Sequence, residues 1–160
     1  MRTAEQTRSV LNSFLLDGML GSLARWLRIA GYDSVYYPGK DDDALIQESK
    51  DSQRILLSQD KLLIQRANKK GVNAILVSSE DTSEQLTQIK TNLSLNLVPI
   101  MSRCPVCNGE LSQRTKEEMQ DNVPEASLNT FDEFWGCVVC EKVYWKGSHW
   151  GKILETLESS

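Results

Sequence analysis

Two kinds of residue in this chain can do chemistry: four cysteines near the C-terminus and a series of aspartates in the first half. The cysteines form two C-x-x-C pairs with 29 residues between the pairs. Four thiolates at this spacing predict one tetrahedral Zn²⁺ site, and a site with four protein ligands has no open position for a substrate. We therefore expect a structural zinc ion bound by Cys104, Cys107, Cys137 and Cys140.

Two other interpretations of the cysteines compete with zinc. Two disulfides are disfavoured because the chain has the features of an intracellular protein. A rubredoxin-like iron site stays open, since four thiolates also bind iron, although no other feature of the sequence indicates electron transfer. A redox or metallochaperone role would follow from that second interpretation.

The aspartates follow the predicted strands at the points where the strands end. These are Asp17, then Asp42 and Asp43, then Asp60, then Asp81. Because ligands of an open parallel sheet bind outside the carboxyl ends of its strands, we expect these carboxylates along one edge. Two charges about 5 Å apart repel by roughly 3 kcal/mol at an effective dielectric of ~20, so such a cluster indicates a bound Mg²⁺ or Mn²⁺. That ion can activate water for attack on a phosphodiester.

Helix capping is the structural alternative for each of these carboxylates, because Asp is a favoured N-cap residue. Asp81 is the clearest cap, since Glu84 completes a capping-box pattern. Asp17 is the least explained by capping, because Gly18 follows it directly. The convergence of Asp17, one of Asp42 or Asp43, and Asp60 favours the functional interpretation.

Short strands alternating with helices position these residues. Apolar runs predict strands at 13–17, 34–37, 55–58 and 74–77, and helical spacing predicts helices at 19–30, 42–50, 62–70 and 83–93. This alternation predicts an α/β fold with a parallel sheet covered by helices on both faces. From residue 100 the pattern changes from alternating strands and helices to short strands, turns and cysteines. We expect one domain at 12–99, and at 100–160 a zinc ribbon, whose interval 108–136 is a loop or hairpin, with a C-terminal helix at 151–157.

The composition excludes several classes of protein. A chain of 160 residues that is 40% hydrophobic holds one ordinary domain or one domain with a small appendage. No apolar run approaches the roughly 20 residues of a membrane span, and the N-terminal residues lack the apolar core of a secretory signal. We expect an intracellular, cytoplasmic protein. The net charge of −4 lies wholly in residues 100–160, so bulk charge does not indicate nucleic-acid binding.

Several segments resemble, in order, the Mut7-C ribonuclease family, a PIN-like nuclease domain with a zinc ribbon. They are FLLDGML at 14–20, LARWLR at 23–28, GYD at 31–33, the acidic pair at 42–43, RILLSQD at 54–60 and YWKGSH at 144–149. The resemblance implies metal-dependent RNA cleavage by Asp17, Asp42 or Asp43, and Asp60, with Asp81 as a weaker fourth. Gln59 departs from the family pattern, which usually has Arg at this position. That arginine can hold a phosphate of the substrate, and this chain lacks it.

Residues on two segments are candidates for contacting RNA, single-stranded or structured. Arg25 and Arg28 lie on the first predicted helix, where a solvated helix face is the alternative. Lys146, Ser148 and His149 follow the last cysteine among aromatic residues that can stack on unpaired bases or pack the ribbon onto the main sheet. A catalytically inactive RNA-binding or scaffolding module is the competing function, which Gln59 and the acidic pI of about 5.1 favour.

Overall fold

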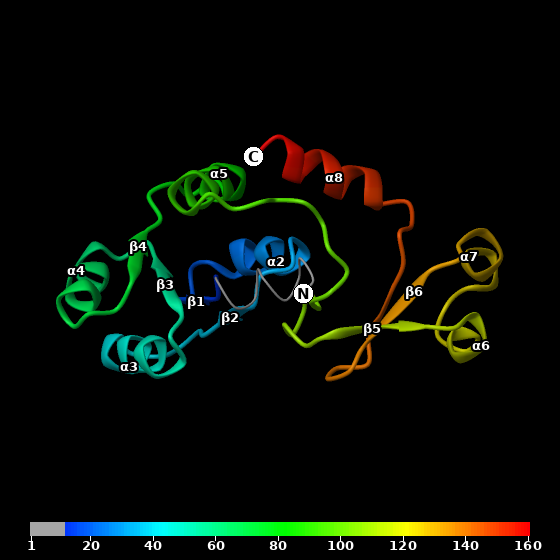
Figure 1. Ribbon diagram of the computed structural model, residues 1–160, viewed down its shortest axis with the longest axis horizontal. Helices are drawn as coiled ribbons and strands as arrows, with labels where there is room; N and C mark the ends of the chain where they lie inside the picture. The colour runs from blue at the N-terminus through cyan, green and yellow to red at the C-terminus, as the bar shows by residue number, and fades with distance from the viewer. Residues whose placement is uncertain (1–11) are drawn as a thin grey trace, which may run out of the picture.

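A four-stranded parallel sheet forms the first part of the computed structural model, which describes residues 12–160 (Figure 1). Its strands lie in the order β2-β1-β3-β4. The elements follow one another as β1 (Phe14–Leu16), α2 (Gly21–Ile29), β2 (Ser34–Tyr36), α3 (Asp42–Ser52), β3 (Ile55–Ser58), α4 (Lys61–Lys69), β4 (Ala74–Leu76) and α5 (Thr82–Leu93). The predicted alternation and the α/β fold class are therefore confirmed, with element ends that differ by a few residues.

Alternate residues of the central strands enter two separate cores. Phe14 and Leu16 of β1 pack with residues of α2 and α5 on one face. Leu15, between them in sequence, packs with Leu56 and with residues of α3 and α4 on the other face. Because successive side chains of a strand point to opposite faces, three fully buried residues in a row are what a sheet covered on both sides requires.

The chain reverses its direction of travel across the sheet between β1 and β3. From β1 it crosses through α2 to β2 on one side, and from β3 it crosses through α4 to β4 on the other. Such a topological switch point leaves a crevice at the carboxyl ends of the two strands, where the helices on either side diverge. Asp17 follows β1 and Asp60 follows β3, so this crevice lies between the two residues.

The cysteine module (residues 100–150) contains a second sheet, which is antiparallel in the order β5-β6-β7. Its strands are β5 (Leu111–Arg114), β6 (Phe134–Cys137) and β7 (Val143–Tyr144). Two short helices, α6 (Lys116–Met119) and α7 (Glu125–Thr130), interrupt the interval that was expected to be a loop or hairpin. That expectation was incomplete because Thr115 and Glu118 form a capping box that starts α6.

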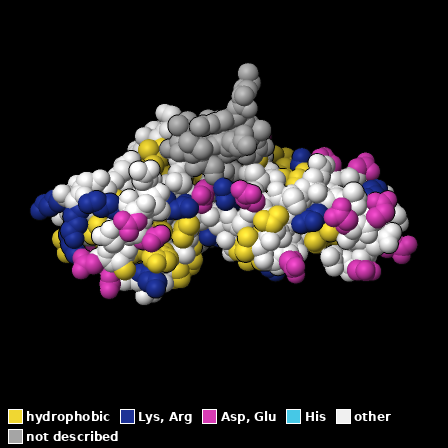
Figure 2. Space-filling view, turned by 60° about the horizontal axis from the view of Figure 1, so that its bottom comes forward, with side chains coloured by type: hydrophobic (Ala, Val, Ile, Leu, Met, Phe, Trp, Pro, Cys, Tyr) yellow, Lys and Arg dark blue, Asp and Glu magenta, His cyan; other side chains and the backbone are white. Residues whose placement is uncertain are grey.

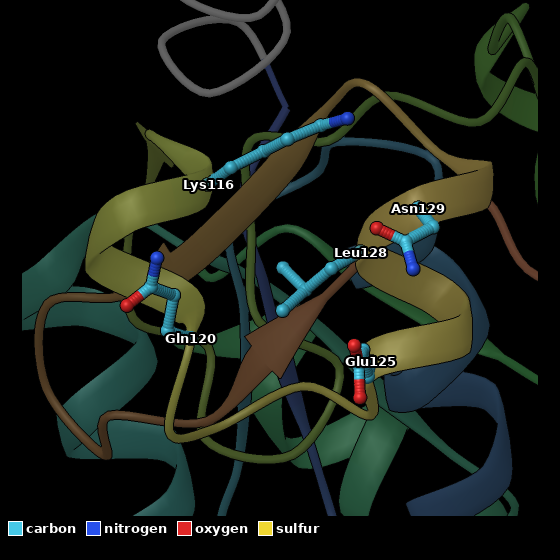
Figure 3. A pocket seen from close by; sticks show the side chains of 5 residues that line it. All are labelled: Lys116, Gln120, Glu125, Leu128 and Asn129. Atoms are coloured by element: carbon cyan, nitrogen blue, oxygen red, sulfur yellow. The ribbon is translucent and has the colours of Figure 1, made fainter.

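A small core stabilises the two short helices. Met119, Val123 and Phe134 are buried together, with Phe131 packed against them. A hollow of about 440 Å³ lies between α6 and α7. Figure 3 shows the side chains that border it, Lys116, Gln120, Glu125, Leu128 and Asn129. Lys116 also forms an ion pair with Asp132 (Nζ to Oδ1, 3.3 Å).

The last helix, α8 (Trp150–Glu158), returns from the cysteine module to the first domain and lies beside α5 (Figure 1). Leu157 is buried in the core that α2 and α5 share, and Ile153 packs against the same core. Lys90 of α5 donates a hydrogen bond to the carbonyl oxygen of Ser160 (2.9 Å). Within the described residues, 12–160, no helix is both long enough and apolar enough to cross a bilayer.

Candidate functional site

Asp17 lies at the switch point, where the strand β1 ends. Its Oδ1 accepts a hydrogen bond from the backbone N–H of Met19 (3.1 Å), which holds the turn into α2. Its Oδ2 accepts a hydrogen bond from the hydroxyl of Ser58, the last residue of the neighbouring strand β3. The parallel register pairs Leu16 with Leu57, so Asp17 and Ser58 are adjacent at the carboxyl edge of the sheet.

Ser58 also connects Asp17 to Asp60. The buried Ser58 hydroxyl accepts a hydrogen bond from the backbone N–H of Asp60 (3.0 Å) while it donates to Asp17. Asp60 caps α4, with Oδ1 accepting from the N–H groups of Leu62 (3.0 Å) and Leu63 (3.2 Å). Within the described residues, Oδ2 of Asp60 has no hydrogen-bond partner. One serine thus links the Asp17 carboxylate to the backbone of Asp60, two of the three principal acidic residues that the sequence indicates.

Asp42 and Asp43 are held by an arginine. Both lie in the first turn of α3 and form ion pairs with Arg66 of α4, Asp42 through Oδ2 (3.2 Å to Nη1). Asp41, directly before them, is the N-cap, because its Oδ1 accepts from the N–H of Ala44 (2.8 Å). The capping alternative therefore applies to Asp41, whereas Asp42 and Asp43 bind the guanidinium of Arg66. Arg66 lies on a different helix from the two aspartates, so this contact has no local sequence signal.

Asp81 caps α5 and lies after the edge strand β4. Its Oδ1 accepts a hydrogen bond from the N–H of Glu84 (3.0 Å). The predicted capping box does not form, because the Ser79 hydroxyl donates to the Glu84 carboxylate and accepts from the N–H of Asp81 (3.0 Å). Gln59 donates from Nε2 to the Ser79 carbonyl oxygen (2.9 Å) and ties the end of β3 to the same loop.

The carboxylates at this edge can supply only part of the ligand shell of a hard divalent cation. Among residues 12–160, the four cysteines are the only group of three or more Cys, His, Asp or Glu side chains close enough to share an ion. Mg²⁺, however, is often bound by one or two carboxylates, with water and substrate phosphate completing its shell. Asp17 and Asp60 offer a donor set of that kind, and Asp42 or Asp43 can join it only by leaving Arg66.

The four cysteines lie around one point in the cysteine module. All are free thiols, and their sulfur atoms lie within 4.8 Å of one another. The Cys104–Cys140 and Cys107–Cys137 sulfur atoms are 3.7 and 3.5 Å apart. Tetrahedral Zn²⁺ with Zn–S bonds of about 2.3 Å needs sulfur atoms about 3.8 Å apart. The cysteines are therefore positioned to bind a metal ion.

The two C-x-x-C turns share one backbone geometry. The N–H of Asn108 donates to the Cys104 carbonyl oxygen (2.9 Å), and the N–H of Glu141 donates to the Cys137 carbonyl oxygen (3.1 Å). Asn108 and Glu141 both have left-handed backbones, with φ of 69° and 66°. In the first turn, the N–H of Gly109, which follows Asn108, donates to Cys107 Sγ (3.4 Å between N and Sγ).

The surroundings of the thiols act on their pKa values in opposite directions. Burial raises the pKa of the Cys107 thiol to about 12. Burial acts the same way on Cys137, but hydrogen bonds from the N–H groups of Cys140 and Val139 outweigh it and lower the pKa of that thiol to about 7. Tyr144 adds a further contact, with its hydroxyl 2.9 Å from Cys104 Sγ. Metal binding must therefore displace protons from some of these thiols.

Gly109 provides a direct test of the thiol geometry. A Cβ atom at this position would lie 2.9 Å from Cys137 Sγ and 2.8 Å from Val139 Cγ2. Because the two turns must close around one ion, we expect Gly109→Ala to weaken metal affinity by about 10- to 100-fold. Gly151→Ala is the matched control, since no atom lies within 4 Å of its Cβ position. Competition with a chromogenic chelator measures both affinities, and equal affinities would contradict this account.

A buried arginine joins the first C-x-x-C turn to α2. Arg28 is 8% exposed, and its guanidinium donates to the carbonyl oxygens of Ser34 (2.9 Å), Pro105 (2.9 Å) and Val106 (3.3 Å). Burial lowers the pKa of Arg28. The structure places this candidate RNA contact at the junction between the first domain and the cysteine module, at the end of α2 away from Asp17.

Asp33 and Asn108 complete this junction. Asp33 receives two hydrogen bonds from Arg54 (2.8 and 3.1 Å) and one from the side chain of Asn108 (2.7 Å). Asn108, which follows Cys107, also accepts from the N–H of Ser34 (3.0 Å). Asp33 and Ser34, at the amino end of β2, thus contact Asn108 directly, and Arg54, before β3, contacts it through Asp33.

We expect the junction to depend on acid pH through Asp33. Burial acts to raise the pKa of Asp33, but the hydrogen bonds from Arg54 and Asn108 outweigh it and hold the pKa below its ordinary value of 3.8. A lowered pKa gives stability that is present above the unfolded-state pKa of about 4 and is lost as the pH falls through the folded-state value. Asp33→Asn should therefore destabilise the protein near neutral pH and much less near pH ~3. Urea unfolding at both pH values measures this, and a deficit that persists at low pH would contradict it.

The remaining candidate RNA contacts lie on exposed surface near the junction. Arg25 is exposed on α2 and has no partner among the described residues. Lys146 is exposed, with its ammonium 5.1 Å from the ring centre of Trp150 and 5.8 Å from that of Trp135. Ser148 and His149 are exposed in the turn before α8. None of these four residues lies at the carboxyl edge that carries Asp17.

Comparison with known proteins adds one match. The family model described as Mut7-C RNAse domain matches residues 12–157, nearly the whole chain and both sheets. The curated proteins gave no match, and neither did the solved structures.

Proposed function

Because the chain belongs to the Mut7-C RNAse domain family, we propose that it hydrolyses RNA phosphodiester bonds with the help of Mg²⁺ or Mn²⁺. The observation that carries this proposal is the linkage of Asp17 to Asp60 through Ser58. It lies at the switch point of a parallel sheet, which is where such folds bind their ligands.

Each residue of this linkage has a distinct role in the proposal. Asp17 and Asp60 hold the divalent ion, which supplies an activated water and charge neutralisation at the phosphate. Ser58 is a positioning residue, since its hydroxyl fixes the Asp17 carboxylate and the start of α4 at the same time. Asp42 or Asp43 can supply a third carboxylate to the ion only after it leaves Arg66, which forms ion pairs with both residues in this structure.

The surface around the proposed site can contact other parts of an RNA strand. Met19 and Leu62 are 77% and 70% exposed and follow Asp17 and Asp60 by two residues. Such apolar side chains beside charged ones suit contact with ribose and bases rather than phosphate. Figure 2 shows Lys and Arg gathered at the left end, where α4 lies, and Asp and Glu frequent at the right end, where α6 and α7 lie. This charge distribution favours contact of RNA with the α4 end over the α6 and α7 end.

We also propose that the metal of the cysteine module is Zn²⁺ and that its role is structural. Four thiolates complete a tetrahedral shell and leave no position for substrate. Free cysteines in a metal-binding arrangement suit a reducing compartment, which supports a cytoplasmic location.

A cleavage assay tests the proposed activity. The purified protein is incubated with end-labelled single-stranded RNA, with Mn²⁺, with Mg²⁺, or with EDTA. We expect products in the presence of either ion and none with EDTA, because zinc held by four thiolates has no open position for catalysis. Cleavage that persists in EDTA would contradict the proposal.

An RNA-binding module without catalysis is the second candidate function. The contact of Arg66 with Asp42 and Asp43 favours it, because the guanidinium occupies two of the acidic residues that a metal site would use. RNA binding without cleavage under all ionic conditions would support this candidate over the nuclease.

A further inference from the structure

The junction between α2, the cysteine module and α8 contains a groove that the proposed chemistry does not use. Two hollows, of about 140 and about 250 Å³, share Tyr144, Trp145, Trp150 and Ile153 as lining residues. The two hollows adjoin at these shared residues, and we call them together the aromatic groove. Its walls present one tyrosine and two tryptophan side chains, all only partly buried.

The charged side chains that line the aromatic groove are both cationic. Arg25 and Arg103 line the smaller hollow, and Arg103 also forms an ion pair with Asp33 (4.0 Å). No Asp or Glu is among the described residues that line either hollow. This is notable because residues 100–160 carry the whole net charge of −4. An anionic ligand is therefore favoured here, on a part of the chain that otherwise repels anions.

Lys146 holds one wall of the aromatic groove in place. Its ammonium lies between the rings of Trp135 and Trp150, 5.8 and 5.1 Å from their centres. These cation–π contacts orient the Trp150 ring at the start of α8, and they keep a positive charge at the edge of the groove. Aromatic faces beside cations are the combination that binds unpaired bases with their phosphates.

The position of the aromatic groove relates it to the proposed site. Arg25 and Ile29 of α2 line the smaller hollow, and Ile29 accepts a hydrogen bond from Ile100 N–H (2.9 Å), where the cysteine module begins. The other end of α2 starts four residues after Asp17. A helix of nine residues is about 13 Å long, a span that a few nucleotides of an extended strand cover. Arg25 lies on the exposed side between the two ends.

We infer that the aromatic groove is a subsite for an unpaired base of single-stranded RNA, which stacks on Trp150 while its phosphates contact Arg25 and Lys146. This inference rests on the proposed function, since it names the form of RNA and the path by which it reaches Asp17. It makes the cysteine module part of substrate recognition, whereas its four thiolates serve only to hold the fold.

Binding measurements on a cleavage-deficient background test this subsite. The Asp17→Asn protein is titrated with a short fluorescein-labelled oligoadenylate and, separately, with the same strand carrying abasic sites. We expect Trp150→Leu to weaken binding of the oligoadenylate about 10-fold and Trp150→Phe to leave it within about 2-fold, because stacking needs an aromatic face. The abasic strand should bind both variants equally.

The charged residues have a separate readout. Arg25→Gln should reduce the dependence of log affinity on log salt concentration by about 0.7, the value for one phosphate of a single strand. Lys50→Ala is the matched control, because Lys50 is an exposed cation on α3, on the opposite face of the sheet. Metal content and thermal unfolding of each variant establish that the fold is intact.

The outcomes separate this inference from the proposed function. Equal binding by the Trp150→Leu and Trp150→Phe proteins would overturn the subsite, even where the wild type cleaves RNA. A wild type that does not cleave, together with binding that depends on Trp150, would uphold the subsite and overturn the nuclease.

Discussion

Asp17→Asn is expected to reduce metal-dependent RNA cleavage by at least about 100-fold while leaving the fold intact. The substitution removes a negative charge from the switch point and keeps Oδ1, which accepts a hydrogen bond from Met19 N–H. The amide NH2 that takes the place of Oδ2 can donate to the Ser58 hydroxyl but cannot accept from it. The loss should therefore appear as weaker Mn²⁺ binding and slower turnover rather than as unfolding. Initial rates over a range of Mn²⁺ concentrations measure it.

Asp51→Asn is the matched control for this variant. Asp51 is an exposed residue of α3 whose carboxylate accepts a hydrogen bond from Gln47 (2.8 Å). Its neutralisation changes the net charge by the same amount at a distance from the switch point, so cleavage should stay within about 2-fold of wild type. A similar loss in both variants would mean that general electrostatics, and not a site at Asp17, controls the rate.

The second large effect concerns the cysteine module. Cys137→Ser should abolish stoichiometric metal binding, because a serine hydroxyl is a poor ligand where three thiolates remain. Structural Zn²⁺ contributes on the order of 10–16 kcal/mol in isolated zinc-finger peptides, more than the small core of Met119, Val123 and Phe134 can replace. Residues 100–150 should then become sensitive to protease, which limited proteolysis followed by mass spectrometry detects.

Val138→Ser is the matched control for Cys137→Ser. It introduces a serine in the same turn but leaves all four thiols in place. Val138 is 56% exposed and directly follows Cys137, and its backbone N–H donates to the carbonyl oxygen of Glu110 (3.0 Å), which the substitution does not alter. We expect the Val138→Ser protein to retain one equivalent of metal and its resistance to protease. Retention of metal by the Cys137→Ser protein would contradict a four-thiolate site.

Local sequence signals were enough to predict the main strands and helices. Apolar runs such as Phe14–Leu16 and Ile55–Ser58 are buried on both faces, so their pattern indicates parallel strands without any knowledge of the partner strands. The spacing of the cysteines likewise indicates the metal-binding group directly. The division of the chain at residue 99 stays a prediction, and α8 packs on the first core although it follows the cysteine module.

Contacts between distant segments were beyond the reach of these signals. The hydroxyl of Ser58 reaches Asp17 only because β3 lies beside β1, and the sequence does not state the strand order. Arg66 belongs to a different helix from Asp42 and Asp43, and Arg28 is 77 residues away from the carbonyl it binds at Pro105. Within one segment, by contrast, the Thr115–Glu118 capping box was a readable signal for α6 that the polar composition of the interval obscured.

Anomalous diffraction from crystals soaked in Mn²⁺ tests the central claim most directly. The account predicts a manganese peak within coordination distance, about 2.2 Å, of both the Asp17 and Asp60 carboxylates, and no such peak in crystals of the Asp17→Asn protein. A manganese ion bound elsewhere in a protein that cleaves RNA, or no bound ion between these two residues, would contradict it.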